Sequence, residues 1–203
     1  MESASSPQPP SVDVALAKGQ GPGELSGAGS LGASNAARLA SFRALFEREI
    51  SYVWTSLRRL GVPERDREDL ANEVFFRVYQ RLDTYDPSRP IRPWLFAFAV
   101  RVASEDRRRA RHRYEELGAE DDAAAQAVTR DPESTTDREL VWKAMDTLDM
   151  DKRAVLVMHD LDGHSVPEIA LALSIPEGTA YSRLRAAREH ITCSVRRQER
   201  RER

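Results

Sequence analysis

The sequence predicts an all-α protein composed of two small helical domains joined by a flexible acidic linker. Apolar residues recur at intervals of three and four over several long stretches, which is the period of one buried helical face. Charge is segregated along the chain: residues 38–113 carry 17 Lys/Arg against 11 Asp/Glu, residues 114–139 carry 2 against 9, and residues 183–203 carry 8 against 3. The formal net charge of −2 therefore conceals two basic blocks separated by an acidic one.

Composition and periodicity divide the chain into five segments. The first 35 residues are rich in Ser, Pro, Gly and Ala and cannot bury enough apolar surface to offset the entropy of ordering, so we expect them to be disordered. Like charge should keep the acidic linker away from DNA. The segments are a disordered extension (1–35), an N-terminal domain (36–113), the linker (114–134), a C-terminal domain (135–197) and a basic tail (198–203) that we expect to fray.

The N-terminal domain is expected to contain helices at about 36–60, 64–82 and 94–112. Gly61 can end the first helix and Pro63 can open the second. Acidic residues at the start of the second helix have two interpretations, a binding face or a simple complement to the helix dipole. The apolar stripe of the first helix comprises Leu39, Phe42, Phe46, Ile50, Val53, Leu57 and Leu60.

A proline-rich loop at residues 83–90 leads into an arginine-rich third helix. Arginines beside Tyr85 and Trp94 form the composition that suits a phosphate backbone and stacking on unpaired bases. The alternative is that both aromatic rings belong to the core and that the arginines only solubilise the helix.

In the C-terminal domain, Asp149 is expected to cap one helix, and residues 162–190 to form a helix-turn-helix. Ser165 and Glu168 have the spacing of a capping box, and Pro176 suits the threshold of the second helix. The second helix carries hydroxyls and arginines on one side, as a helix that enters a major groove does. The alternative is a plain helical hairpin with a solvated basic face.

The sequence predicts no catalytic site, so we expect that the protein is not an enzyme and uses no cofactor. Cys193 is the only cysteine, which excludes an internal disulfide and fits a reducing cytoplasm. His159 and His164 lack a third metal ligand. The first ten residues do not have the pattern of a secretory signal, and the longest apolar run is too short to insert into a membrane, so we expect a cytoplasmic location.

From about residue 40 to 197, the chain resembles a bacterial RNA polymerase sigma factor of the sigma-70 family, extracytoplasmic-function (ECF) group. The stretch DREDLANEVFFRVYQRLDTYDPSRPIRPWLFAFAVRVA is similar to the family's region 2, and SVPEIALALSIPEGTAYSRLRAARE is similar to region 4. The resemblance implies a subunit that binds core RNA polymerase through its beta-prime and beta subunits, recognises promoter DNA and helps open the minus-ten element. An anti-sigma factor is a further partner expected of the family.

The resemblance also implies roles for individual positions. Residues placed at the polymerase contact are Asp69, Leu70, Glu73, Val74, Phe75 and Arg77. Residues placed at the minus-ten element are Tyr85, Arg89, Trp94, Arg101, Arg107 and Arg108. Residues placed at the minus-thirty-five element are Glu177, Thr179, Tyr181, Ser182, Arg183, Arg185 and Arg188.

The chain departs from the family pattern in the third helix. Val100, Arg101 and Glu105 stand where the family often has Arg, Asn and Asp. Two other functions remain open at this point: a stand-alone helix-turn-helix regulator, which would bind duplex DNA without polymerase, and a helical interaction module with no DNA role.

Overall fold

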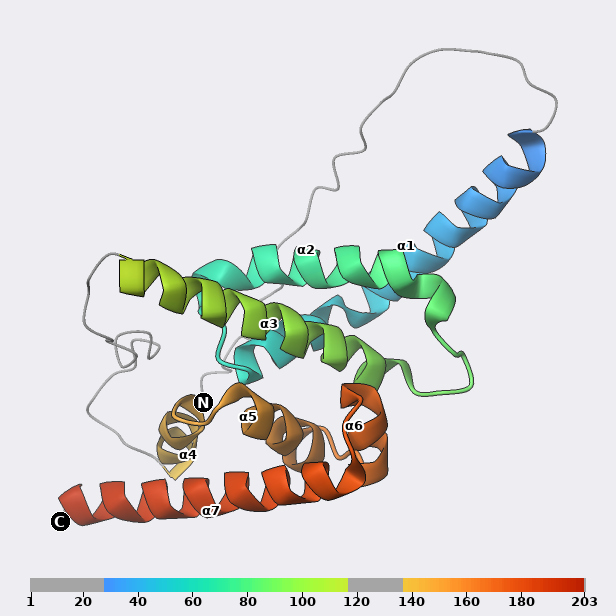
Figure 1. Cartoon of the computed structure of the whole chain (residues 1–203). Helices are drawn as coiled ribbons and strands as arrows, with labels where there is room; N and C mark the ends of the chain where they lie inside the picture. The colour runs from blue at the N-terminus through green and yellow to red at the C-terminus, as the bar shows by residue number, and fades with distance from the viewer. Residues whose placement is uncertain (1–27, 117–136, 203) are drawn as a thin grey trace, which may run out of the picture. The chain divides into compact units, whose positions relative to one another are not determined.

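The computed structural model describes residues 28–116 and 137–202, and these ranges contain helices and no strand (Figure 1). This confirms the predicted all-α fold. A boundary between two compact units, residues 1–51 and 52–203, falls inside the first helix. The helices are α1 (Ala28–Arg59), α2 (Glu64–Arg81), η1 (Leu82–Thr84), α3 (Ile91–Glu116), α4 (Asp137–Asp146), α5 (Met150–Leu156), η2 (Val157–Leu161), α6 (Val166–Leu173) and α7 (Glu177–Glu202).

The turn between α1 and α2 forms as its Gly and Pro predict. Gly61 adopts a positive φ of 89°, and the backbone N–H groups of Gly61 and Val62 donate to the carbonyls of Arg58 and Leu57 at 3.1 and 3.0 Å. This is the Schellman pattern, which satisfies the last carbonyls of a helix. Pro63 then occupies the N-cap position of α2.

Helices α2 and α3 pack side by side and share one apolar core (Figure 1). The core side of α2 is formed by Ala71, Val74, Phe75 and Val78, each at most 2% exposed. Leu95, Phe96 and Ala99 of α3 are completely buried. Burial of this surface leaves the loop between the two helices at the edge of the core, where its side chains are accessible.

The C-terminal helices pack on α7, which contacts α4, α5 and α6. The expected caps are present: the Asp149 carboxylate accepts the backbone N–H of Lys152 at 2.9 Å. The Glu168 carboxylate accepts the backbone N–H of Ser165 at 2.8 Å and its hydroxyl at 2.7 Å. These caps fix where α5 and α6 begin, and so they position the helix-turn-helix.

Three helices extend beyond the predicted limits. α1 begins at Ala28 rather than 36, and α3 spans Ile91–Glu116 rather than 94–112. α7 continues to Glu202, so the tail predicted to fray is helical. Arginine and glutamate favour helix at the C-terminal ends of α3 and α7, and the sequence offers no strong stop signal there. The first residues of α1 include Gly29 and Gly32, and helix propensity does not explain its early start. Residues 1–27 and most of the predicted linker (117–134) lie outside the described residues.

The turn inside the helix-turn-helix allows a stabilising substitution. Ser174 has φ 56° and ψ 46°, the left-handed conformation in which a side chain is strained. We expect Ser174→Gly to raise the free energy of unfolding by about 0.5–1 kcal/mol, measured by urea unfolding. Ser182→Gly, in the middle of α7, is the matched control and should instead lower it by about 0.5–1 kcal/mol. Loss of stability in Ser174→Gly would contradict the assigned turn.

Candidate nucleic-acid interface

The predicted polymerase face of α2 separates into inner and outer positions. Val74 and Phe75 are 0% and 2% exposed, so their side chains support the core and do not form a contact surface. Asp69 is exposed, whereas Leu70 and Glu73 are partly exposed. Phe76, which has no role among the predicted contact residues, is 58% exposed. Its exposure follows from helix phase, because Phe76 lies about 100° around the axis from Phe75.

Arg77 is engaged within the protein. Its guanidinium donates to both carboxylate oxygens of Glu105 on α3, at 2.9 and 2.6 Å, and to Glu73 at 2.7 Å. Glu105 is one of the positions that depart from the family pattern, and here it clamps α2 to α3. These bonds hold the pKa of Glu105 below its ordinary value, chiefly through the hydrogen bonds from Arg77.

This clamp predicts a pH-dependent stability. A carboxyl whose pKa is lower in the folded state stabilises the fold above its unfolded-state pKa, and that stabilisation disappears as the pH falls through the folded-state pKa. We expect Glu105→Gln to lower the free energy of unfolding at pH 7 by about 1 kcal/mol, because the pair is partly solvated. The difference from the unsubstituted protein should shrink below about pH 4 in urea unfolding. Glu68→Gln, an exposed site on α2, is the control, and a pH-independent loss in Glu105→Gln would contradict the clamp.

An aromatic and cationic surface lies where α3 begins. The ring centroids of Tyr85 and Trp94 are 5.1 Å apart, and Trp94 meets Phe98 edge-on at 4.9 Å. The Tyr85 hydroxyl donates to the Arg89 carbonyl at 2.6 Å, which fixes the loop beneath the ring. The guanidinium carbon of Arg101 lies 5.9 Å from the Phe98 ring centroid. We name Tyr85, Arg89, Trp94, Phe98 and Arg101 the aromatic–arginine surface.

A tight turn supports the loop of this surface. The Asp86 carboxylate accepts the backbone N–H of Ser88 at 3.0 Å and its hydroxyl at 2.7 Å, and it pairs with Arg89 at 3.2 Å. The hydrogen bonds from Ser88 are the main reason why the pKa of Asp86 lies below its ordinary value. Trp94 is only half-buried. Its ring packs on Phe98, and the residue is not fully buried.

The remaining arginines of α3 lie further along the helix. Arg107 and Arg108 are both exposed. Arg107 makes a long contact of 3.4 Å to the Leu148 carbonyl. Arg109 approaches Glu105 at 3.8 Å. This part of α3 can supply positive charge toward a phosphate backbone.

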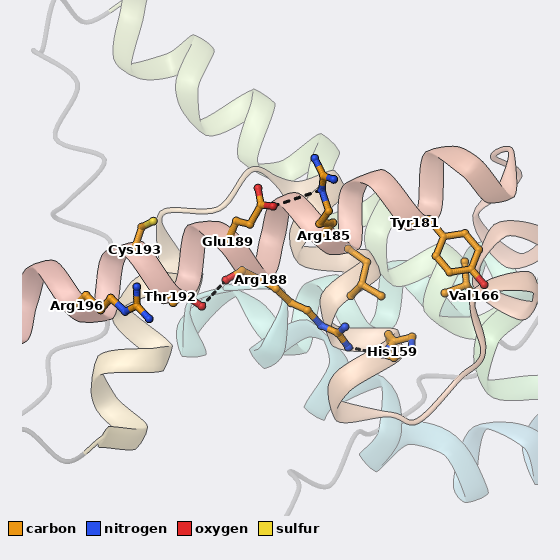
Figure 2. A pocket seen from close by; sticks show the side chains of 10 residues that line it. His159, Val166, Tyr181, Arg185, Arg188, Glu189, Thr192, Cys193 and Arg196 are labelled. Atoms are coloured by element: carbon orange, nitrogen blue, oxygen red, sulfur yellow. Dashed lines mark hydrogen bonds and ion pairs between the residues drawn. The ribbon is translucent and has the colours of Figure 1, made fainter.

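The residues predicted to contact duplex DNA lie on helix α7. A cavity of about 570 Å³ is lined by side chains of this helix (Figure 2). Tyr181 is 57% exposed, and Glu177 and Ser182 are also exposed. Thr179 is half-buried, and its carbonyl accepts the Ser182 hydroxyl at 2.9 Å. Ala180, Leu184 and Ala187 anchor the opposite face of the helix in the core.

The three arginines predicted on α7 differ in how freely they can meet a ligand. Arg188 donates to both oxygens of Asp160, and this pairing is the main reason why the pKa of Asp160 lies below its ordinary value. Arg183 pairs with Asp151 of α5. Arg185 has a side chain that is 82% exposed, and it contacts only its helical neighbour Glu189, at 3.4 Å, among the described ion pairs. In Figure 2, Arg188 points toward His159 while Arg185 lies beside Glu189.

Within the described part of the chain, no group of His, Cys, Asp and Glu side chains could hold a metal ion. No described helix is long and apolar enough to cross a bilayer. A helix-turn-helix together with a cluster of aromatic and arginine side chains in one all-α chain is typical of a DNA-binding protein.

Comparison with known proteins identifies the family. Residues 45–113 match sigma-70 region 2, and residues 138–191 match sigma-70 region 4. The ECF RNA polymerase sigma factor SigL of Mycobacterium tuberculosis is 33% identical over 155 residues, which cover 75% of this chain and 87% of SigL. The chain belongs to the sigma-70 family, in the ECF group of RNA polymerase sigma factors. It is therefore a protein that directs RNA polymerase to promoters.

Two solved structures have a fold similar to that of this chain. CnrH in complex with the cytosolic domain of CnrY has a TM-score of 0.54 at 26% identity and covers 76% of this chain and 87% of CnrH. The sigma factor RpoE in complex with the anti-sigma factor NepR, from Bartonella quintana, has a TM-score of 0.57 at 19% identity. That match covers 77% of this chain and 97% of RpoE, and it supports the fold alone.

Proposed function

We propose that the two contact surfaces divide promoter recognition between them. The aromatic–arginine surface of region 2 takes up unpaired bases of the minus-ten element, with Tyr85 and Trp94 for stacking and Arg89 and Arg101 for phosphates. Unstacking costs a few kcal/mol per base step, and stacking on protein rings compensates for it. The observation that supports this role is the Tyr85–Trp94–Phe98 ring series, in which Trp94 is partly exposed and lines a cavity together with Arg89 and Arg101.

Helix α7 of region 4 is assigned to the minus-thirty-five element. Its exposed side chains, above all Tyr181 and Arg185, can enter a major groove, while Arg183 and Arg188 are held by carboxylates of their own domain. On α2, the exposed side chains of Asp69 and Phe76 beside Glu73 are the proposed contact with core polymerase. The domain limits that we propose are those predicted from the sequence, 36–113 and 135–197.

Two further proposals rest on the relatives. An anti-sigma factor is a proposed partner, as the resemblance to the family implies, and CnrH was solved in complex with the cytosolic domain of CnrY. A cytoplasmic location is proposed because RNA polymerase acts on the chromosome. We also propose that the protein has no catalytic activity of its own.

Run-off transcription with core polymerase of the source bacterium tests the proposed function. Core enzyme plus this chain should produce discrete 5′ ends that core alone does not, and mapping these ends genome-wide would define the promoters. A chain that fails to bind core in a pull-down, yet binds duplex DNA tightly alone, would instead be a stand-alone helix-turn-helix regulator.

Two arginines of α7 differ in how far their guanidinium groups are engaged within the protein, so their substitution should affect DNA binding differently. We expect Arg185→Ala to weaken holoenzyme binding to promoter duplex by about 1–3 kcal/mol if it contacts a base, or to reduce the salt slope by about 1 if it contacts a phosphate. Arg188→Ala is the matched control and should weaken binding less, because Asp160 already occupies its guanidinium. Fluorescence anisotropy at several salt concentrations measures both, and an equal loss in the two variants would contradict the assignment.

A further inference from the structure

Helix α7 continues well beyond the part of the chain that matches the family. The match to sigma-70 region 4 ends at residue 191, whereas α7 runs to Glu202. We name residues 192–202 the α7 extension. At a rise of 1.5 Å per residue, the extension adds about 17 Å to the helix. Residues 192–203 contain five arginines and two glutamates, so this end of the chain carries an excess of positive charge that the roles proposed for α7 do not use.

One side of the last turns of α7 is partly covered by the protein. Half-buried residues recur there at the three- and four-residue spacing of one packed helical face. They are Ile191, Ser194, Val195 and Gln198. Helix α4 contacts α7, and Thr147 Oγ1, just after α4, lies 2.7 Å from His190 Nε2. The α7 extension is therefore supported on one side, so its other side faces a defined direction.

That other side continues the face of α7 that is assigned to DNA. At 100° per residue, Arg196 and Arg200 lie within about 60° of Arg185 around the helix axis. Tyr181, Arg185 and Arg196 line the same cavity of about 570 Å³, and Figure 2 shows them spaced along α7. The face that presents Tyr181 and Arg185 therefore continues into the α7 extension without a change of direction.

The arginines on this face are available to an anion. Arg196 and Arg200 are exposed and, within the described part of the chain, neither pairs with a carboxylate, unlike Arg183 and Arg188. A cation near the negative end of a helix stabilises that helix, but only within the last turn. This effect accounts for Arg200 but not for Arg196, which lies more than one turn before Glu202.

The length of α7 places these arginines beyond the groove that the start of the helix is proposed to enter. Along the helix axis, Arg196 lies about 17 Å from Arg185, and Arg200 lies about 23 Å from it. The major groove is only about 12 Å wide. A side chain on the same face and this far from the base-reading residues therefore lies over the phosphates that border the groove. A guanidinium in that place can donate two hydrogen bonds to one phosphate.

We propose that the α7 extension binds the sugar–phosphate backbone of promoter DNA beside the minus-thirty-five element, with Arg196 and Arg200 as the phosphate contacts. This inference rests on the proposed minus-thirty-five role of α7. Contacts of this kind fix the position of region 4 on the duplex and carry no sequence information. They raise the affinity for every promoter alike, because they release counterions from the DNA. The choice of bases stays with Tyr181 and Arg185, nearer the start of the helix.

The test compares holoenzyme binding to promoter duplex for the unsubstituted chain and for the double variant Arg196→Ala, Arg200→Ala. Fluorescence anisotropy at several salt concentrations gives the slope of log affinity against log salt concentration. Each lost phosphate contact should reduce the magnitude of this slope by about 0.9, so the double variant should lose about 1.8. The variant Arg196→Lys, Arg200→Lys should keep the slope, because an ammonium still pairs with a phosphate. Arg43→Ala, at an exposed arginine of α1, is the control and should leave the slope unchanged.

Ethylation interference locates the contact. Phosphates whose modification weakens binding of the unsubstituted holoenzyme, but not of the double variant, should flank the minus-thirty-five element. An unchanged slope in the double variant, while Arg185→Ala still weakens binding, would overturn the inference and leave the proposed role of α7 intact. Weaker binding to core polymerase in a pull-down, with an unchanged slope on DNA, would assign the α7 extension to a protein partner and would also overturn it. If Arg185→Ala had no effect either, the minus-thirty-five role itself would fail, and the inference with it.

Discussion

Replacing Arg153 with methionine is expected to cost about 3–5 kcal/mol of folding free energy, the largest loss of stability that we predict for one substitution in this chain. Methionine matches the length of the arginine stem but donates no hydrogen bond. The carbonyls of Arg59 and Met145 and the Asp146 carboxylate would each lose a donor. A buried acceptor that has lost its donor is left with the full free-energy cost of its desolvation. The expected loss of stability is therefore larger than that caused by removing a surface ion pair.

Urea unfolding followed by circular dichroism measures this loss. Arg43→Met is the matched control: Arg43 pairs with Glu47 on the same helix, its side chain is 79% exposed, and its loss should change stability by less than about 0.5 kcal/mol. Arg153→Lys should recover only part of the difference, because an ammonium cannot reproduce the three-way fork of a guanidinium. If Arg153→Met proved as stable as the control, the cluster around Arg153 could not be a structural centre.

Short-range signals predicted much of this fold. Gly61 with Pro63, Asp149, and Ser165 with Glu168 each act within five residues, so the local sequence contains both partners of each of these caps. The helix ends without such signals differ from the prediction: α1 and α3 begin early, at Ala28 and Ile91, and α3 and α7 continue to Glu116 and Glu202. Helix limits are therefore predictable where a capping group stops the chain, and poorly predictable where helix-favouring residues simply continue.

Long-range contacts could not be predicted in this way. Arg153 stands in the run MDKRAVLVM, where nothing in the local sequence distinguishes a buried arginine from an exposed one, and its acceptor on Arg59 is 94 positions away. Asp162 lies in the turn after η2, but its partners Tyr52 and Arg59 lie on α1. Which of Phe75 and Phe76 is buried depends on which face of α2 packs against α3, and the local sequence does not determine that face.

Replacing Trp94 with alanine is expected to reduce transcription from duplex promoters by about fivefold to 150-fold, since stacking of one base on an aromatic ring contributes about 1–3 kcal/mol. The loss should fall on promoter opening and not on the first encounter with duplex DNA. A template that is already unpaired across the minus-ten element should therefore restore a large part of the activity. Trp94→Phe, which keeps an aromatic ring against Tyr85 and Phe98, should lose less.

Tyr181→Ala provides the contrast, because Tyr181 is an exposed aromatic residue on the helix assigned to intact duplex. Its defect should remain on the unpaired template, since the minus-thirty-five contact is made before and independently of opening. Permanganate footprinting of unpaired thymines separates the two steps directly. If Trp94→Ala and Tyr181→Ala responded equally to the unpaired template, the division of labour between region 2 and region 4 would be wrong for these two residues. Rescue of Trp94→Ala alone would assign base capture to the aromatic–arginine surface.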